Sequence, residues 1–244
     1  MNRIKILRCI LFLLFSLLNT CLYARNWKVI NEETVHVLYL KEQLQLKKQK
    51  DKMHFNLHAW KELKNQNPDF WAWIQWEDNL VSQPIVIDTG GQQYLHLSFK
   101  QEKSLSGTPF IFDIEAKNKV IYGHHVGYGT SDSVFTNLAN LIDKNQFYEH
   151  QKFYLCLEKK VEEYTLLLVG EKGTWDYQQK EFHNTSEFYS WIQNARETSI
   201  VYDDSLNPRY QDSYITIQTC KDSYSSKRII LLAIKTDEYV LHMD

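Results

Sequence analysis

The sequence predicts a mostly β protein, a largely antiparallel β-barrel with inserted helices that follows an N-terminal anchor. Short apolar runs separated by turn residues recur from Asn67 onward, a pattern typical of barrels and sandwiches. Aromatic residues reach 14% of the chain, whereas there are only 8 glycines and 4 prolines, a composition that favours strand-rich packing. With 43% apolar residues among 244, the chain can bury a substantial core, which excludes wholesale disorder.

The charge balance excludes one class of partner. The chain has 28 lysines and arginines against 30 aspartates and glutamates, a net charge of -2. A nucleic-acid-binding protein needs a basic excess, so this function is not expected.

The first segment, residues 1–25, has the pattern of an export signal. Arg3, Lys5 and Arg8 precede the uncharged residues 9–24, a positive flank followed by an apolar run. At about 1.5 Å per residue this run spans roughly 24 Å, which is short for a membrane helix and long for the core of a cleaved signal. Because the small-residue cleavage pattern is only half met, we expect a retained single-pass anchor with the rest of the chain outside the cell. A cleaved signal is the alternative.

The second segment, residues 26–66, is predicted to be helical and membrane-proximal. Residues 25–64 carry nine lysines and arginines against five acidic residues, so the basic charge gathers next to the anchor. This basic face would rest against an anionic envelope surface or belong to a solvated stalk. Helical spacing of apolar residues predicts two helices, one through Val35, Leu38 and Leu44 and one through Leu57, Trp60 and Leu63.

The third segment, residues 67–244, is predicted to form the barrel. Two stretches interrupt its strands with helical spacing, one through Phe135 and Ile142 and one through Phe188 and Trp191. The second is expected to begin at Asn184, because this residue can cap a helix. Predicted strands cover Ile85–Ile87, Pro109–Phe112, Lys119–Tyr122, Lys152–Glu158, Val161–Val169, Tyr214–Thr219 and Ile229–Ile234.

Only two of the four cysteines face the exported space, because Cys9 and Cys21 lie in the apolar run. Cys156 falls in an alternating strand, where a buried thiol is ordinary. One remaining pair does not make a disulfide framework, although a Cys156–Cys220 bridge stays open as the alternative.

Cys220 and Arg228 carry the first chemical signal. Residues 214–220 form a predicted strand that ends in the thiol, a polar loop follows, and Arg228 opens the next strand. Adjacent strands lie about 4.8 Å apart, so the guanidinium can reach the space in front of the sulfur. A nearby cation activates a thiol and stabilises negative charge on a substrate oxygen.

His124 and His125 carry the second signal. They end the predicted strand that begins near Asn118 and run into Gly127-Tyr128-Gly129. Alternation places the two rings on opposite faces, so at most one should meet the thiol. The same alternation argues against a metal site, since no cysteine or carboxylate pattern stands at ligand spacing. We expect no metal and no cofactor.

These residues, in this order, resemble the signature of the sortases, membrane-anchored cysteine transpeptidases of the Gram-positive cell surface. The carriers are Tyr122-Gly123-His124, Thr219-Cys220 and Arg228. Four further features resemble class B sortases in particular. They are residues 67–74 (NPDFWAWI), residues 147–150 (FYEH), the helix expected at 185–198 and the Cys-to-Arg hairpin.

The resemblance implies an eight-stranded sortase barrel with N-terminal helices and a helix before the cysteine strand. It implies Cys220 as the nucleophile, His124 as the general acid/base and Arg228 as the cation that positions substrate and stabilises the oxyanion. Thr219, Gln218 and His125 would contact substrate. Two positions depart from the family, which usually has a small hydroxyl residue where this chain has Gln218 and, in class B, often asparagine where it has His125.

The implied reaction cuts a sorting motif near the C-terminus of a secreted protein and passes the acyl group from a Cys220 thioester to an amine. The acceptor would be a peptidoglycan precursor or a pilin lysine. Two other readings stay open: a cysteine peptidase that only hydrolyses, and a non-enzymatic surface barrel that binds ligands through Trp71, Trp73 and Trp76.

Overall fold

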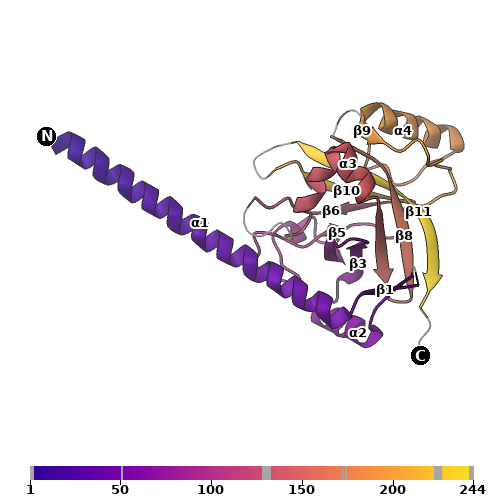
Figure 1. Cartoon of the computed structure of the whole chain (residues 1–244), viewed down its shortest axis with the longest axis horizontal. Coiled ribbons are helices and arrows are strands. Elements are labelled where there is room, and N and C mark those ends of the chain that lie inside the picture. The colour runs from indigo at the N-terminus through magenta and orange to yellow at the C-terminus, as the bar shows by residue number, and fades with distance from the viewer. Residues whose placement is uncertain are drawn as a thin grey trace.

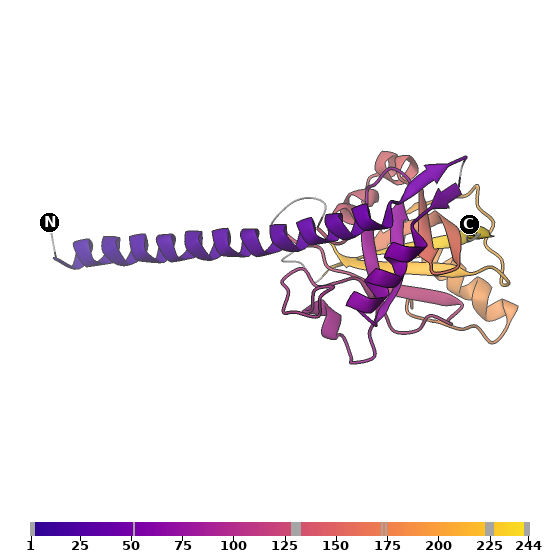
Figure 2. The same cartoon turned by 90° about the horizontal axis from the view of Figure 1, so that it is seen from below.

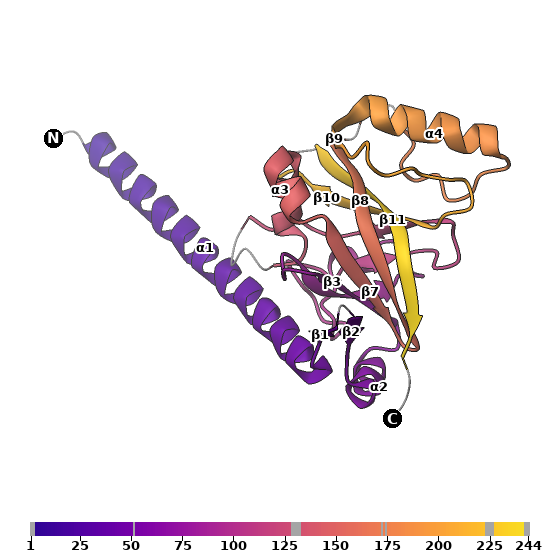
Figure 3. The same ribbon diagram turned by 45° about the vertical axis from the view of Figure 1, so that its right-hand side comes forward.

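A computed structural model describes residues 3–50, 52–127, 133–171, 173, 175–222 and 227–241. A long helix, α1, leads into a β-barrel and extends well beyond it at its N-terminal end (Figures 1 and 2). The barrel carries a helix, α4, on its outer side (Figure 3).

Helix α1 runs without interruption over Arg3–Leu44, so the expected anchor and the first membrane-proximal helix are one element. Within Ile10–Leu44 it has a window long and apolar enough to cross a membrane, a property that membrane anchors and signal sequences share. Its C-terminal half packs on the barrel through a stripe that includes Ile30, Thr34, Leu40 and Leu44.

The buried face of α1 corrects one prediction. Val35 and Leu38, expected in the apolar stripe, are 57% and 43% exposed, whereas Leu44 is buried as expected. Hydrophobicity alone did not reveal that the polar residue Thr34 belongs to the buried stripe.

Helix α2 spans Leu57–Gln66 and confirms the second predicted helix. The Asn56 side chain caps it by accepting hydrogen bonds from the backbone N–H groups of His58 and Ala59. Between α1 and α2 lies a small hairpin that the sequence did not predict, formed by β1 (Lys47–Gln49) and β2 (Lys52–His54).

The barrel is closed by eight strands, as predicted. Their order around the ring is β11-β10-β6-β5-β4-β3-β7-β8, and pairing of β8 with β11 closes it. The β10–β6 and β4–β5 pairs are parallel and the other pairs antiparallel. The strands are β3 (Phe70–Trp76), β4 (Ser82–Ile87), β5 (Phe110–Ile111), β6 (Asn118–Tyr122), β7 (Lys152–Leu157), β8 (Lys160–Glu171), β10 (Tyr214–Cys220) and β11 (Arg228–Val240), with β9 (Ser199–Tyr202) added to the edge of β8.

The helices between strands follow the sequence in one case and depart from it in another. Helix α4 covers Thr185–Thr198, and Asn184 caps it by accepting from the backbone N–H of Glu187. The stretch expected as a helix through Phe135 and Ile142 is instead a 3-10 helix, η2 (Thr136–Ile142). It stops because Asp143 caps a new helix, α3 (Lys144–Glu149); a further 3-10 turn, η1, covers Gln93–Leu95.

Alternation along β10 and β11 divides their side chains between two cores. Ile215 and Ile217 of β10, with Ile229 and Leu231 of β11, point into the barrel. Tyr214 lies on the other face with α4. Consequently the even-numbered residues of both strands share the outer face.

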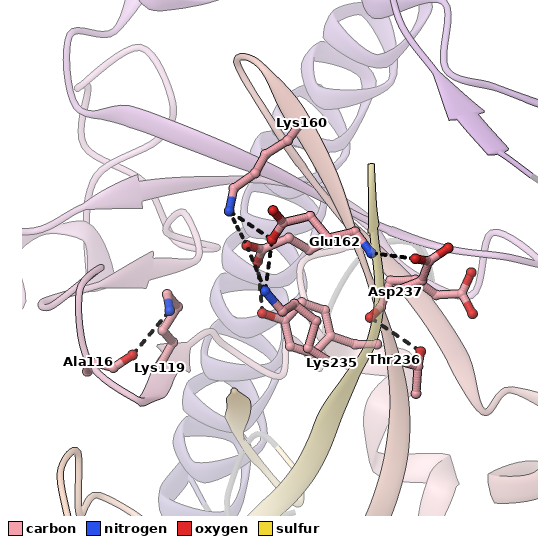
Figure 4. A network of polar contacts seen from close by, with 10 residues as sticks. Ala116, Lys119, Lys160, Glu162, Lys235, Thr236 and Asp237 are labelled. Carbon is pink, nitrogen blue, oxygen red and sulfur yellow. Dashed lines mark hydrogen bonds and ion pairs between the residues drawn. The ribbon is translucent and has the colours of Figure 1, made fainter. Parts of the chain in front are cut away.

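A network of charges closes the end of the barrel where β6 and β8 begin (Figure 4). Glu162 is buried, and its carboxylate accepts hydrogen bonds from Lys160 Nζ at 2.7 Å and from the Tyr164 hydroxyl at 2.9 Å. Lys235 Nζ lies 3.9 Å from the same carboxylate. Burial lowers the pKa of nearby Lys119, whose ammonium donates to the carbonyl of Ala116 at 3.1 Å.

Candidate active site

Cys220 and Arg228 meet at the opposite end of the barrel. Their Cα atoms are direct partners in the antiparallel β10–β11 ladder, as are Gln218 and Ile230 two residues further along. Because alternation carries even-numbered residues to the outer face, the thiol and the guanidinium share that face. Cys220 is half-buried, so the sulfur is not sealed beneath its neighbours.

The alternative disulfide is not formed. Cys220 is a free thiol, and so is Cys156, which is completely buried in β7. Burial raises the pKa of the Cys156 thiol strongly, so this cysteine is chemically inert at neutral pH.

Strand β6 delivers His124 to the same end. It runs parallel to β10 with Tyr122 opposite Gln218, and the N–H of Gly123 extends the ladder by donating to the Gln218 carbonyl at 3.1 Å. His124 and Cys220 therefore follow the last ladder positions of two neighbouring strands that point the same way. The geometry brings the three predicted residues to one strand edge.

A hydrogen bond sets the tautomer of His124. Its Nε2 lies 2.9 Å from the carbonyl oxygen of Leu95 at the end of η1. A carbonyl can only accept, so Nε2 carries the hydrogen and Nδ1 is left as the basic nitrogen when the ring is neutral. Burial lowers the pKa of His124 below its ordinary 6.5, the bond with Leu95 opposes this, and the charges of His96 and Arg228 add to the lowering. The free imidazole is consequently neutral at pH 7.

His125 also lies at the cysteine. Its ring hydrogen-bonds the backbone of Cys220, while Nδ1 is buried with no hydrogen-bond partner among the described residues. Burial lowers the pKa of this ring, and the charge of Asp222 opposes the shift. The two histidines thus reach the end of β10 in different ways, which alternation alone did not reveal.

Gln218 and Thr219 occupy opposite faces of β10. The Gln218 side chain lies on the outer face, half-buried, and its Oε1 accepts a hydrogen bond from the Tyr177 hydroxyl. Thr219 is completely buried, and its hydroxyl has no partner within the described part of the chain. A substrate can therefore reach the Gln218 side chain, whereas Thr219, which was predicted to contact substrate, is covered by its neighbours.

The segment that carries Tyr177 is tied down beside the site. Asn118 Nδ2 donates to the carbonyls of Tyr177 at 3.1 Å and Gln179 at 2.8 Å, and Trp191 of α4 donates to the carbonyl of Asp176 at 2.7 Å. Burial raises the pKa of the Tyr177 hydroxyl, and the positive charge of Arg228 opposes the shift. Arg228 therefore acts electrostatically on Tyr177 as well as on His124.

Glu171 forms ion pairs with both sides of the loop that connects Cys220 to Arg228. Its carboxylate pairs with Lys221 at 2.5 Å and with Lys227 at 3.3 Å, the two residues that flank the loop. The backbone N–H of Lys221 also donates to the Lys227 carbonyl at 3.0 Å. Ser223 in the loop between Cys220 and Arg228, and Tyr128 and Gly129 after the two histidines, lie outside the described residues.

Leu95, Tyr177 and Glu171 are site residues that sequence reasoning did not find. Leu95 acts through its backbone carbonyl, which leaves no trace in the residue type. Tyr177 comes from an irregular segment with no periodicity, and Glu171 is one of 30 acidic residues. No group of three or more potential metal ligands occurs within the described ranges.

Known proteins are similar to this chain in sequence and in fold. The chain is 28% identical over 181 residues to sortase B of Staphylococcus aureus, covering 70% of this chain and 72% of that protein. The structure of Clostridium perfringens sortase B matches with a TM-score of 0.65 and 27% identity, covering 72% of this chain and 99% of that one. The chain is similar to class B sortases in both sequence and fold. No family model matches it.

A further sortase B structure, from B. anthracis, has a TM-score of 0.70 at 20% identity and covers 84% of this chain and 97% of that one. This likeness shows that the sortase barrel persists where the sequence has diverged. The relatives indicate a family of cysteine transpeptidases, which fits a half-exposed thiol between a histidine and an arginine on adjacent strands.

Proposed function

We propose that this chain is a class B sortase, a transpeptidase that cleaves a C-terminal sorting motif of secreted proteins through a thioester on Cys220 and transfers the acyl group to an amine. The observation that carries the proposal is the convergence of three strand ends. Cys220 pairs directly with Arg228, and β6 runs parallel to the cysteine strand up to His124.

The first half of the reaction forms the thioester. The basic Nδ1 of His124 accepts the proton of the Cys220 thiol as the sulfur attacks the scissile carbonyl carbon. The carbon–nitrogen bond then breaks, and the same nitrogen returns the proton to the departing amine. A neutral imidazole at rest, favoured by the lowered pKa of His124, suits this order of proton transfers.

Arg228 is the group proposed to stabilise the oxyanion. A guanidinium offers parallel N–H donors to carbonyl oxygens, a geometry that a lysine ammonium lacks. Its effect on the pKa values of both His124 and Tyr177 supports a position between the histidine and the wall beside the thiol.

The residues next to Cys220 are proposed to hold the sorting peptide. Gln218 presents its side chain on the outer face, and the Tyr177 hydroxyl occupies its Oε1, so the amide N–H groups remain to donate to a peptide carbonyl. Thr219 is completely buried and would support the cysteine strand from inside the barrel, and His125 would act through the backbone of Cys220.

The second half of the reaction attaches the protein to its acceptor. The amine, from a peptidoglycan precursor or a pilin lysine, attacks the thioester, and the sulfur leaves as the free thiol. The number of amide bonds is unchanged, so the reaction needs no metal, cofactor or energy source.

The location proposed for this chemistry is the outer side of the cell membrane. Residues 1–25 would form the single-pass anchor, residues 26–66 the membrane-proximal segment and residues 67–244 the catalytic barrel. The exposed apolar part of α1 supports this arrangement. Phe12 and Leu17 are 71% and 62% exposed, so these apolar side chains do not pack on the barrel.

A surface barrel that binds ligands through its tryptophans is the less favoured function. Trp73 and Trp76, two of the three residues in question, are completely buried in β3. Ligand binding that is unchanged in Cys220→Ala, together with no acyl adduct on Cys220 of the wild type, would support the binding function instead.

The test uses the full chain in lipid nanodiscs with a panel of sorting peptides and amines, and mass spectrometry of the adduct on Cys220. We expect an acyl adduct in the wild type and an amine-linked product. Cys220→Ala and His124→Ala should form no adduct, Arg228→Lys should be severely impaired, and Cys156→Ala is the matched control that should react normally. If the cleaved peptide is released only as its free carboxylic acid, even at high amine concentration, the enzyme is a hydrolase instead.

A further inference from the structure

We propose that the membrane-proximal part of α1 positions His124, with Ile30 and Thr34 as positioning residues for the proton transfer. The proposal rests on the proposed function, in which His124 is the general acid/base. It adds that the helix expected to anchor the enzyme is also a structural support of its active site.

The first contact is a pair of buried hydroxyls. Thr34 Oγ1 lies 2.8 Å from Ser133 Oγ, and the two residues are 7% and 2% exposed. Because the Thr34 hydroxyl already donates to the Ile30 carbonyl at 2.9 Å, its single hydrogen is used and Ser133 must donate to it. The helix therefore offers a directed acceptor to the segment that leads away from His124.

The second contact is apolar. Ile30 is 1% exposed and belongs to the same buried cluster as Val126, Val134 and Phe135. Val126 lies two residues after His124, and Val134 follows Ser133. The helix thus shares one buried cluster with both described ends of the segment between His124 and η2.

Hydrogen bonds connect the same segment to His124 and to Val126. The N–H of Phe135 donates to the His124 carbonyl at 3.1 Å, and the N–H of Val126 donates to Thr136 Oγ1 at 3.1 Å. Thr136 Oγ1 in turn donates to the Ser133 carbonyl at 2.7 Å. Each bond links a residue near the catalytic histidine to the residues that contact α1.

Backbone strain shows that this segment needs support. Val134 has a φ of +47°, in the left-handed region that a β-branched residue avoids. Such a conformation costs free energy and persists only where the surroundings hold it. Val134 lies in the same buried cluster as Ile30, and its neighbour Ser133 is hydrogen-bonded to Thr34, so loss of the α1 contacts should let it relax.

The experiment uses the full chain in nanodiscs and compares three variants. Thr34→Val keeps the shape and removes the hydroxyl, and Thr34→Ser restores it. Thr165→Val is the matched control: Thr165 is also 7% exposed, and its hydroxyl lies 3.3 Å from that of Thr236 on strands remote from His124.

Two readouts separate positioning from general stability. Hydrogen exchange of the Phe135 amide reports the bond to His124 directly, and the pH profile of kcat reports the histidine. For Thr34→Val we expect about fivefold faster exchange, about fivefold lower kcat and a shifted acid limb, the effect of losing one buried hydrogen bond. KM should stay near the wild-type value, Thr34→Ser should recover most of the loss, and Thr165→Val should leave exchange and pH profile unchanged.

The outcomes distinguish this inference from the proposed function. Unchanged Phe135 exchange and unchanged kcat in Thr34→Val would overturn the positioning role while leaving the sortase reaction intact. Equal effects of Thr165→Val on the pH profile would overturn it too. If exchange accelerates as expected but the wild type forms no adduct, the structural coupling holds and the proposed function fails.

Discussion

Gly123, the residue before His124, offers a sharp test of how the histidine is held. A methyl group added at this position would lie 2.3 Å from Cδ2 and 2.6 Å from Cε2 of the Phe135 ring. Ordinary contact begins near 3.4 Å, so the ring or the backbone must move by about 1.1 Å. Phe135 is completely buried, which leaves the ring no open space to enter.

The expected cost of Gly123→Ala has two parts. Overpacking of this kind destabilises by about 1–3 kcal/mol. For a domain of this size that lowers Tm by roughly 2–12 °C, at about 2–4 °C per kcal/mol. A misplacement of about 1 Å at a catalytic group can cost on the order of 100-fold in rate, so adduct formation should fall far more than stability does.

The assay measures thermal unfolding and thioester formation at 25 °C for three variants. Gly123→Ala/Phe135→Leu makes room for the methyl group and should recover part of the rate. Gly173→Ala is the control, because its nearest contact would be 3.5 Å from a Thr198 methyl group. If Gly123→Ala stays within twofold of the wild-type rate, the contact between the glycine and the Phe135 ring does not position His124.

Three further predictions follow from the charges and thiols. Arg228→Gln should raise the pKa of His124 without bringing it to 6.5, because burial is the larger cause of the lowering. NMR titration of labelled histidine measures this pKa, and a lower pKa in the variant would contradict the prediction. Iodoacetamide at pH 8 should label Cys220 but not Cys156, whose burial raises its pKa, and peptide mapping that finds Cys156 modified in the folded protein would be inconsistent with the core of β7. Lys235 and then Lys160 hold the pKa of Glu238 at about 2, so the stability from this pair is present above its ordinary 4.5 and is lost as the pH falls from there towards 2. Glu238→Gln should therefore flatten the acid limb of stability, modestly because the side chain is 38% exposed, and urea unfolding at several pH values measures the change.

Much of the fold could be predicted because its signals are local. Alternating residues marked the strand β7, a continuous apolar run marked part of β8, and the capping pair Asn184 and Glu187 marked the start of α4. The two-residue strand β5 was found, but hairpin β1–β2 and edge strand β9 were not, since short exposed strands carry little hydrophobic pattern.

The sequence by itself predicted a cysteine enzyme that resembles the sortases, because Cys220 and Arg228 flank one hairpin loop and are brought together by local chain geometry. Only the tertiary structure decided what surrounds them. The carbonyl of Leu95, the hydroxyl of Tyr177 and the buried pair of Thr34 and Ser133 are separated from the catalytic residues by long stretches of chain. Their contacts arise from closure of the barrel and docking of α1, which no local pattern encodes.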